Sequence, residues 1–222
     1  MTELEQILAS GQPYFGAAFQ ANQGSAYFPY LKNIVKSIPR RPLTILEIGS
    51  WAGNSLNAWN DASDKTANFI VIDTWAEYIS DAVMTHAART GDIEKLFWHN
   101  MKTIGVTDRM LVYKGTSHEI LPTLPDNSVD IVFIDGDHRY EYVKHDILNS
   151  LRLIRKGGFL CGDDLLRQVH EVKDLAHCKF VALNGQHTED ADGIGYHPGI
   201  TMAVSEIFGR VQTFDRLWMV QR

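Results

Sequence analysis

The sequence predicts an α/β fold, with a doubly wound, Rossmann-like sheet of seven mostly parallel strands, helices on both faces and the last strand antiparallel. Three observations carry this prediction. Short apolar runs alternate with segments of helical spacing, several of those runs end in an acidic residue, and one leads directly into a glycine-rich turn. In such a sheet, ligands bind beyond the carboxyl ends of the strands, so the residues that follow the apolar runs are the candidate site.

Near-continuous apolar runs are typical of buried parallel strands. They occur at residues 44–48, 68–73, 110–113, 129–135 and 159–161. Helical spacing occurs at 4–8, 31–38, 56–59, 76–104, 117–121, 142–154 and 200–208. Glycines at 157 and 158 predict the end of the helix over 142–154. We expect a strand at 179–183, a polar loop at 185–195, and a closing antiparallel pair at 211–214 and 217–220.

The chain has 222 residues, 45% hydrophobic and 22% charged, which favours one globular domain over residues 1–222. Within it we expect an N-terminal helical or lid segment at 1–40 and a cofactor- and metal-binding core at 41–164. After the core we expect a lid or insertion at 165–198, and then a closing helix and strand pair at 199–222. Aromatic residues in the first segment favour packing on the sheet over a lid, and could also form a homo-oligomer interface.

The net charge is −6 and there is no run of basic residues, which argues against nucleic acid or an anionic membrane surface as a partner. Cys161 and Cys178 lack the C-x-x-C spacing of a zinc site and are predicted to be thiols in a reducing compartment. The first residues do not resemble a secretory signal and no run reaches membrane-spanning length, so we expect a cytoplasmic protein.

The turn after the first apolar run has the pattern E-x-G-x-x-x-G-x-S, formed by Glu47, Gly49, Gly53 and Ser55, with Ser50 between the glycines. It lacks the lysine of a phosphate-binding loop and the G-x-G-x-x-G spacing of a dinucleotide site. A carboxylate at this point would repel phosphates and suits a cationic or hydroxyl-rich ligand. The alternative is a buried strand that simply turns into a helix.

Two further places can contribute to a nucleoside site. Asp73 ends the second run about 20 residues after the glycine turn, where an acid can accept hydrogen bonds from ribose hydroxyls. A turn-forming or helix-capping acid is the alternative. Ser117 and His118 follow the third run in a turn of small residues that caps a helix.

Acids also follow the fourth and fifth runs. Asp135 ends one, and Asp163 and Asp164 follow the other. Carboxylates that meet at one sheet edge repel each other unless a cation neutralises them. They are oxygen ligands of the kind that Mg²⁺ binds, although the last two could instead cap a helix.

The glycine-turn motif resembles that of class I S-adenosylmethionine-dependent methyltransferases. The I-D-G-D-H run at 134–138, with G-D-D at 162–164, is similar to metal-dependent O-methyltransferases, above all the macrocin-type sugar O-methyltransferases and more distantly catechol O-methyltransferase. Catechol O-methyltransferase has Lys where His138 stands and Asn where Asp164 stands. Both departures favour a sugar-type acceptor over a catechol.

The resemblance implies methyl transfer from S-adenosylmethionine to a hydroxyl of a small molecule, such as a sugar or glycosylated natural product. It implies a cofactor site formed by Glu47, Gly49, Ser50, Gly53, Ser55, Asp73, Ser117, His118 and Asp135. Mg²⁺, or another divalent cation, would be held by Asp135, Asp163 and Asp164. His138, or less favourably Asp137, would accept the proton. Among the remaining histidines, His197 is the one most expected to face the pocket.

Two alternatives stay open at this point. One is a metal-dependent hydroxylase related to the cephalosporin hydroxylases, although oxygenation by iron would favour histidine ligands over the all-carboxylate set. The other is a non-catalytic module that binds a nucleoside. An NAD-linked oxidoreductase is disfavoured by the glycine spacing.

Overall fold

The computed structural model describes residues 1–23, 25–77, 82–186, 188–191 and 194–222. Seven strands form one sheet in the order β3-β2-β1-β4-β5-β9-β8. The pairs among β1 to β5 are parallel, whereas β9 runs antiparallel to both β5 and β8. None of the helices in these ranges combines the length and the apolar character that a membrane crossing requires.

The sheet strands are β1 (Thr44–Ile48), β2 (Asn68–Asp73), β3 (Met110–Lys114), β4 (Val129–Ile134), β5 (Ile154–Gly162), β8 (Gln212–Phe214) and β9 (Leu217–Gln221). A separate hairpin consists of β6 (Glu189–Ala191) and β7 (Ile194–Tyr196). The helices are α1 (Glu3–Ala9), α2 (Phe28–Ser37), α3 (Asn54–Ala62), α4 (Ala82–Arg89), α5 (Asp92–Thr103), α6 (Ser117–Ile120), α7 (Tyr140–Leu153), α8 (Leu175–Leu183) and α9 (Pro198–Phe208).

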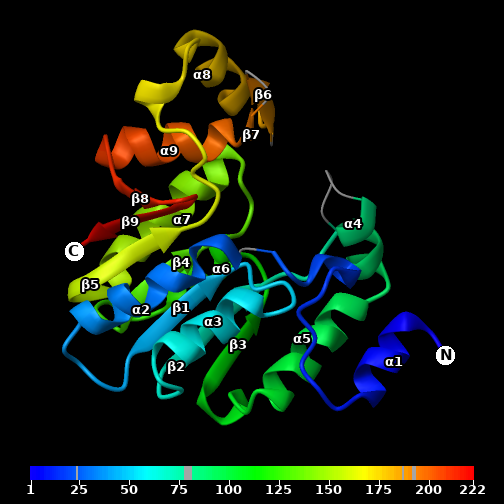
Figure 1. Ribbon diagram of the computed structural model, residues 1–222. Coiled ribbons are helices and arrows are strands. Elements are labelled where there is room, and N and C mark those ends of the chain that lie inside the picture. Colours follow the sequence, from blue (N-terminus) through cyan, green and yellow to red (C-terminus); the bar gives the residue numbers. More distant parts are fainter. Residues whose placement is uncertain (24, 78–81, 187, 192–193) are drawn as a thin grey trace.

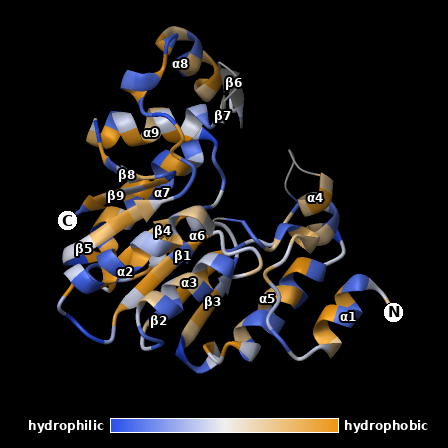
Figure 2. Cartoon of the chain, viewed as in Figure 1, coloured by the Kyte–Doolittle hydropathy of each residue, from blue (hydrophilic) through white to orange (hydrophobic). Residues whose placement is uncertain are grey.

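Each face of the sheet has its own hydrophobic core. In β1, Ile45 belongs to the cluster that packs on α2 and α3, whereas Leu46 belongs to the cluster that packs on α7 and α9. The same alternation continues through β4, where Phe133 and Val132 point to opposite faces. The central strands are accordingly apolar along their length (Figure 2). Figure 1 shows α8, α9 and the β6–β7 hairpin beyond the β5 side of the sheet, and α1, α4 and α5 beyond its β3 edge.

The predicted doubly wound sheet is confirmed, including the closing antiparallel pair on either side of Asp215 and Arg216. The predicted strand at 179–183 is wrong. Asp174 accepts a hydrogen bond from the His177 backbone N–H and begins α8, which continues through Leu183. Its buried residues Cys178, Val181 and Ala182 have helical spacing rather than alternation.

The predicted glycine end of α7 is also wrong, because the helix stops at Leu153 and residues 154–162 form β5. Gly158 lies so close to β4 that a Cβ there would come within 2.3 Å of the Asp130 carbonyl oxygen. The glycine therefore serves the contact between strands and does not cap the helix. Of the predicted polar loop at 185–195, residues 187, 192 and 193 lie outside the described residues, and parts of the rest form the hairpin.

The N-terminal segment packs on the sheet, as its aromatic residues favour, whereas a role as a lid or as an oligomer interface stays a prediction. Tyr27 is fully buried, with its ring 5.7 Å from that of Phe133 on the sheet. The preceding stretch reaches the carboxyl ends of the strands, where Trp51 donates a hydrogen bond to the Phe19 carbonyl oxygen and Asn54 donates one to that of Gln23. This segment therefore packs on the sheet and also supplies part of the rim of the site.

Candidate active site

A cavity of about 670 Å³ lies at the carboxyl ends of the parallel strands. Its volume falls within the roughly 300 to 1,000 Å³ typical of small-molecule sites. The loops that follow β1, β2, β3, β4 and β5 all contribute to its wall. The predicted site residues that line it are Gly49, Ser50, Ser55, Asp73, Ser117, His118, Asp135, Asp137, His138 and Asp164.

The glycine turn after β1 has a shape that other residues cannot adopt without strain. Gly49 has φ +82°, and a Cβ there would lie 2.2 Å from the Asp135 carbonyl oxygen. Gly53, at φ +83°, precedes α3, and a Cβ there would meet the Met101 side chain at 2.3 Å. Gly49 therefore lets the turn pass close to the end of β4, and Gly53 lets the start of α3 pack closely against Met101 of α5.

Asp73 holds this turn in place from the end of β2. Its Oδ2 accepts hydrogen bonds from the backbone N–H groups of Ser50 and Trp51, both at 2.8 Å. Its Oδ1 accepts one from Trp75 at 2.7 Å. Burial raises the pKa of Asp73, while these backbone donors act in the opposite direction. Because Asp73 also lines the cavity, the same carboxylate can meet a ligand.

Glu47 lies beneath the turn rather than on the cavity wall as the structure describes it. Its Oε1 accepts hydrogen bonds from the hydroxyls of Ser50, at 2.5 Å, and Ser55, at 3.1 Å. Its Oε2 has no hydrogen-bond partner among the described residues. Burial raises the pKa of Glu47 to about 8, so the side chain is largely protonated at neutral pH. Its direct contact with a cofactor stays a prediction.

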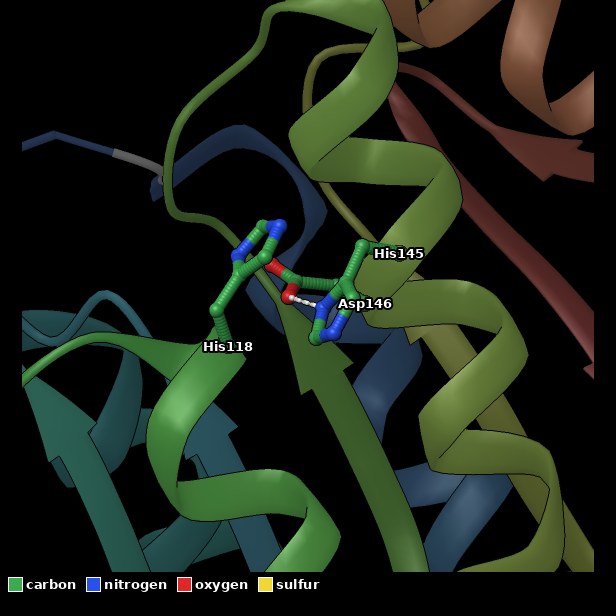
Figure 3. A group of neighbouring side chains, drawn as sticks. All are labelled: His118, His145 and Asp146. Carbon is green, nitrogen blue, oxygen red and sulfur yellow. Dashed lines mark hydrogen bonds and ion pairs between the residues drawn. The ribbon is translucent and has the colours of Figure 1, made fainter.

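The β3 side of the cavity carries a second group of side chains, shown in Figure 3. The rings of His118 and His145 stack with their centroids 3.6 Å apart and their planes 9° from parallel. His145 Nδ1 lies 3.4 Å from Oδ1 of Asp146, which is buried. Burial raises the pKa of Asp146 to about 7, opposed by a hydrogen bond with Ser117. Because ring lone pairs lie in the ring planes, two parallel rings cannot aim at one ion, and this group suits a planar ligand better than a metal.

The β5 side of the cavity brings together the three predicted acids. Asp135, Asp163 and Asp164 each offer an oxygen, and these oxygens lie within 4.8 Å of one another. Arg216, in the turn between β8 and β9, donates hydrogen bonds to both oxygens of Asp163, at 2.8 and 2.9 Å. Its Nη2 also lies 3.0 Å from Oδ1 of Asp164. Asp163 is therefore paired within the protein, whereas Asp135 and Asp164 line the cavity.

The loop after β4 supplies the two predicted proton acceptors. The ring of His138 is largely buried, and burial lowers its pKa, so the imidazole is neutral near pH 7. Asp137 forms an ion pair with Arg139, whose Nε lies 3.0 Å from each of its oxygens. Asp135 is buried beside two other acids, and burial followed by the charges of Asp163 and Asp164 raises its pKa well above the ordinary value.

A comparison with protein families matches residues 46–165, more than half of the chain, to a family described as a methyltransferase domain. The chain belongs to this methyltransferase family. The matched range begins in β1 and ends just after Asp164, so it contains the glycine turn and the acids of the cavity.

Similar proteins agree with this membership. An O-methyltransferase, hkm8, of Aspergillus hancockii is 30% identical over 57% of this chain and 45% of its own length. A catechol O-methyltransferase of Mycobacterium tuberculosis is 28% identical over 50% of this chain and 48% of its own. The chain thus spans about half the length of these curated relatives. The solved structure of the O-methyltransferase NovP shares the fold, with a TM-score of 0.57 and 19% identity over 90% of this chain and 80% of that one.

The methyltransferase domain contains site residues that sequence reasoning missed. Arg216 lies 53 residues after Asp163, in a turn that carried no motif. Asp146 lies on α7, where it resembles an ordinary polar residue of an amphipathic helix. His197 lines the cavity, as expected of it, but its partner Asp164 was not predicted. Asp164 itself has φ +60°, a conformation uncommon outside glycine that sequence patterns do not reveal.

Replacing Glu47 with Gln should change how the stability of the methyltransferase domain depends on pH. The pKa of Glu47 is raised above its ordinary value of 4.5, so its contribution to stability is complete below about pH 4.5 and is lost as the pH rises through about 8. The substituted glutamine would stay neutral and could still accept both serine hydrogen bonds. At pH 9 we expect E47Q to be more stable than the wild type by on the order of 2 kcal/mol, with a smaller difference at pH 5.

Urea unfolding of the cofactor-free protein at both pH values measures this difference. The same change at Glu141, which is exposed in the first turn of α7, gives a matched control that should not depend on pH. An equal effect of E47Q at pH 5 and pH 9 would contradict a protonated Glu47.

Proposed function

We propose that this protein transfers the methyl group of S-adenosylmethionine to a hydroxyl oxygen of a small molecule. The observation that carries the proposal is a single cavity with two chemically different sides. The glycine turn and Asp73 lie beside β1 and β2, and the group of Ser117 and His118 follows β3. The acids and His138 lie across β4 and β5. A donor on the first side and an acceptor on the second would meet where β1 borders β4, which favours transfer by alignment.

The cofactor fits the residues of the first side. Asp73 offers carboxylate oxygens for ribose hydroxyls, and Ser117 and His118 border a stacked imidazole surface suited to adenine. Gly49 allows a close approach of the cofactor to the backbone of the turn. Asp135, directly after β4, lies between the two sides, and a sulfonium bound beside it would stabilise its ionised form.

We propose that a divalent cation, Mg²⁺ or another, assists the reaction. The three carboxylates fit such a cation only in part. Arg216 already pairs with Asp163, whereas Asp135 and Asp164 remain on the cavity wall. A cation bound there would lower the pKa of an acceptor hydroxyl. Proton acceptance is assigned to His138 or Asp137, as the sequence predicts. His138 has the neutral imidazole that this role requires, whereas Arg139 holds Asp137 as an ion pair.

For the acceptor we propose a sugar or glycosylated natural product, supported by the resemblance to the macrocin-type enzymes. Among relatives, the names O-methyltransferase and catechol O-methyltransferase support transfer to oxygen. A cytoplasmic location is supported by Cys161 and Cys178, both of which are buried as thiols. Assembly as a homo-oligomer through residues 1–40 stays a prediction.

Calorimetry with S-adenosylhomocysteine tests the first half of this proposal. We expect the wild type to bind it, and Asp73→Asn to weaken binding at least 10-fold, because the variant loses the charge that faces the ribose and holds the turn. Asp108→Asn, at an exposed position, is the control. Methyl-labelled S-adenosylmethionine with a panel of glycosides and other polyhydroxylated molecules tests the second half. No binding of S-adenosylhomocysteine by the wild type would refute the proposal.

One observation favours a second candidate, a metal-dependent hydroxylase. His138 and His197 lie beside Asp164, and two histidines with one carboxylate are the ligands of many non-haem iron oxygenases. Family membership and the cofactor side of the cavity favour methyl transfer. Oxygen uptake measured with Fe²⁺ and the same acceptor panel separates the two, because methyl transfer consumes no oxygen.

A further inference from the structure

We infer that the cavity binds a divalent transition metal through His138, Asp164 and His197, in preference to Mg²⁺ bound by three carboxylates. The inference deepens the proposed function, because it names the cation and ligands of the same site. The three side chains come from three separate places, namely the loop after β4, the end of β5 and the start of α9.

The ligand atoms already converge. Nε2 of His138 lies 3.6 Å from Oδ2 of Asp164, and Nε2 of His197 lies 3.8 Å from the same oxygen. Both separations exceed a good hydrogen bond. Two ligands held at about 2.1 Å from one ion lie about 3.0 to 3.5 Å apart, so small side-chain rotations would bring these atoms to coordination distances. Oδ1 of Asp135, 3.8 Å from His138 Nε2, is a fourth candidate ligand.

The ring orientations also fit a shared ion. The planes of His138 and His197 are 70° apart, with centroids at 4.3 Å. Lone pairs in two such planes can meet at one point. The stacked pair of His118 and His145, only 9° from parallel, cannot do this, and it provides a natural comparison within the same protein.

The charges indicate a divalent ion. Arg216 neutralises one of the three acids, since it bonds to both oxygens of Asp163. The carboxyl groups of Asp135 and Asp164 remain in a largely buried place, where they would repel each other if both were ionised. A neutral imidazole does not offset that repulsion, whereas a bound divalent cation would stabilise both carboxylates. Arg216 also removes Asp163 from the available ligands, which shifts the donor set from oxygen alone to mixed nitrogen and oxygen.

The fold brings the second histidine to this place through Gly199. A Cβ at Gly199 would lie 2.2 Å from the His138 carbonyl oxygen and 2.5 Å from the Tyr140 backbone nitrogen. The first turn of α9 can therefore press against the loop after β4, and His197, directly before that turn, comes beside His138.

The donor set decides between metals. Mg²⁺ takes oxygen ligands and keeps its waters, whereas imidazole suits later first-row ions such as Fe²⁺, Co²⁺, Ni²⁺ and Zn²⁺. A metal on Nε2 of His138 would also change that residue from proton acceptor to ligand. Of the two predicted residues, Asp137 would then be the proton acceptor, and it would have to act despite its ion pair with Arg139.

Metal titrations of chelator-treated protein test the inference without an activity assay. We expect Co²⁺ to produce visible absorption bands on binding, and calorimetry to show Co²⁺ and Zn²⁺ bound at least 100-fold more tightly than Mg²⁺. His197→Ala should weaken Co²⁺ binding at least 10-fold. His145→Ala and His170→Ala, the latter at an exposed position, are the matched controls and should leave Co²⁺ binding unchanged. S-adenosylhomocysteine binding by His197→Ala confirms that the variant is folded.

A measurement on the wild type tests the inference even if the His197→Ala variant does not fold. Bound Mn²⁺ should show coupling to imidazole nitrogen in pulsed electron paramagnetic resonance. Mg²⁺ bound as tightly as Co²⁺, no nitrogen coupling, or unchanged Co²⁺ binding by His197→Ala would each overturn the inference. Failure to bind S-adenosylhomocysteine with normal Co²⁺ binding would overturn the proposed function alone.

Discussion

Replacing Arg216 with Met is expected to lower the free energy of unfolding by about 3 kcal/mol at pH 7.5, measured by urea denaturation in the presence of a chelator. The guanidinium is the fork-shaped partner of both oxygens of Asp163, whose side chain is 1% exposed. Met fills a similar volume but leaves that carboxylate buried and unpaired. Removal of one partner of a buried ion pair is costly because the remaining charge has lost its solvation without compensation.

A second substitution, at the carboxylate partner Asp163, tests whether the unpaired buried charge causes the loss of stability. Asp163→Asn in the Arg216→Met background should recover much of the lost stability, since it removes the stranded charge. Lys95→Met is the matched control, because Lys95 forms an exposed ion pair with Asp92 at 3.2 Å, and it should cost less than about 1 kcal/mol. A small effect of Arg216→Met, or no recovery in the double variant, would show that the ion pair does not stabilise the fold.

Replacing Gly49 with Ala is expected to weaken S-adenosylhomocysteine binding at least 100-fold and to destabilise the protein by more than about 2 kcal/mol. Two costs combine at this position. The φ of +82° is unfavourable for alanine, and the new Cβ would lie 2.2 Å from the backbone oxygen of Asp135. The neighbouring strand end cannot give way as a flexible side chain would, so the turn itself must move away from the cavity.

Gly91 offers a matched control for the conformational cost alone. It has φ +70°, and a Cβ there would meet nothing within 4 Å. Gly91→Ala should therefore cost about 1 kcal/mol and leave S-adenosylhomocysteine binding unchanged. Calorimetry and urea unfolding of both variants make the comparison. Similar effects of the two substitutions would mean that contact between the turn and Asp135 does not shape the site.

Much of the fold could be predicted from local patterns. The apolar runs of β1, β2 and β4 are near-continuous and rich in β-branched residues, and each leads into a glycine turn or an acid, which together favour a buried parallel strand. The prediction at 179–183 failed because a short apolar run does not by itself distinguish strand from helix. In this segment the N-cap at Asp174 and the packing of α8 on α9 stabilise a helix.

The sequence by itself determined the order of the five parallel strands, the glycine turn and the acids at the strand ends, because each follows from residue types within one short segment. Only the tertiary structure decided how these acids are used. It placed Arg216 on Asp163 and His197 beside His138, and it put Glu47 beneath the turn. These contacts join residues from separate elements, and their distances depend on how the strand ends and α9 pack, which no local pattern contains.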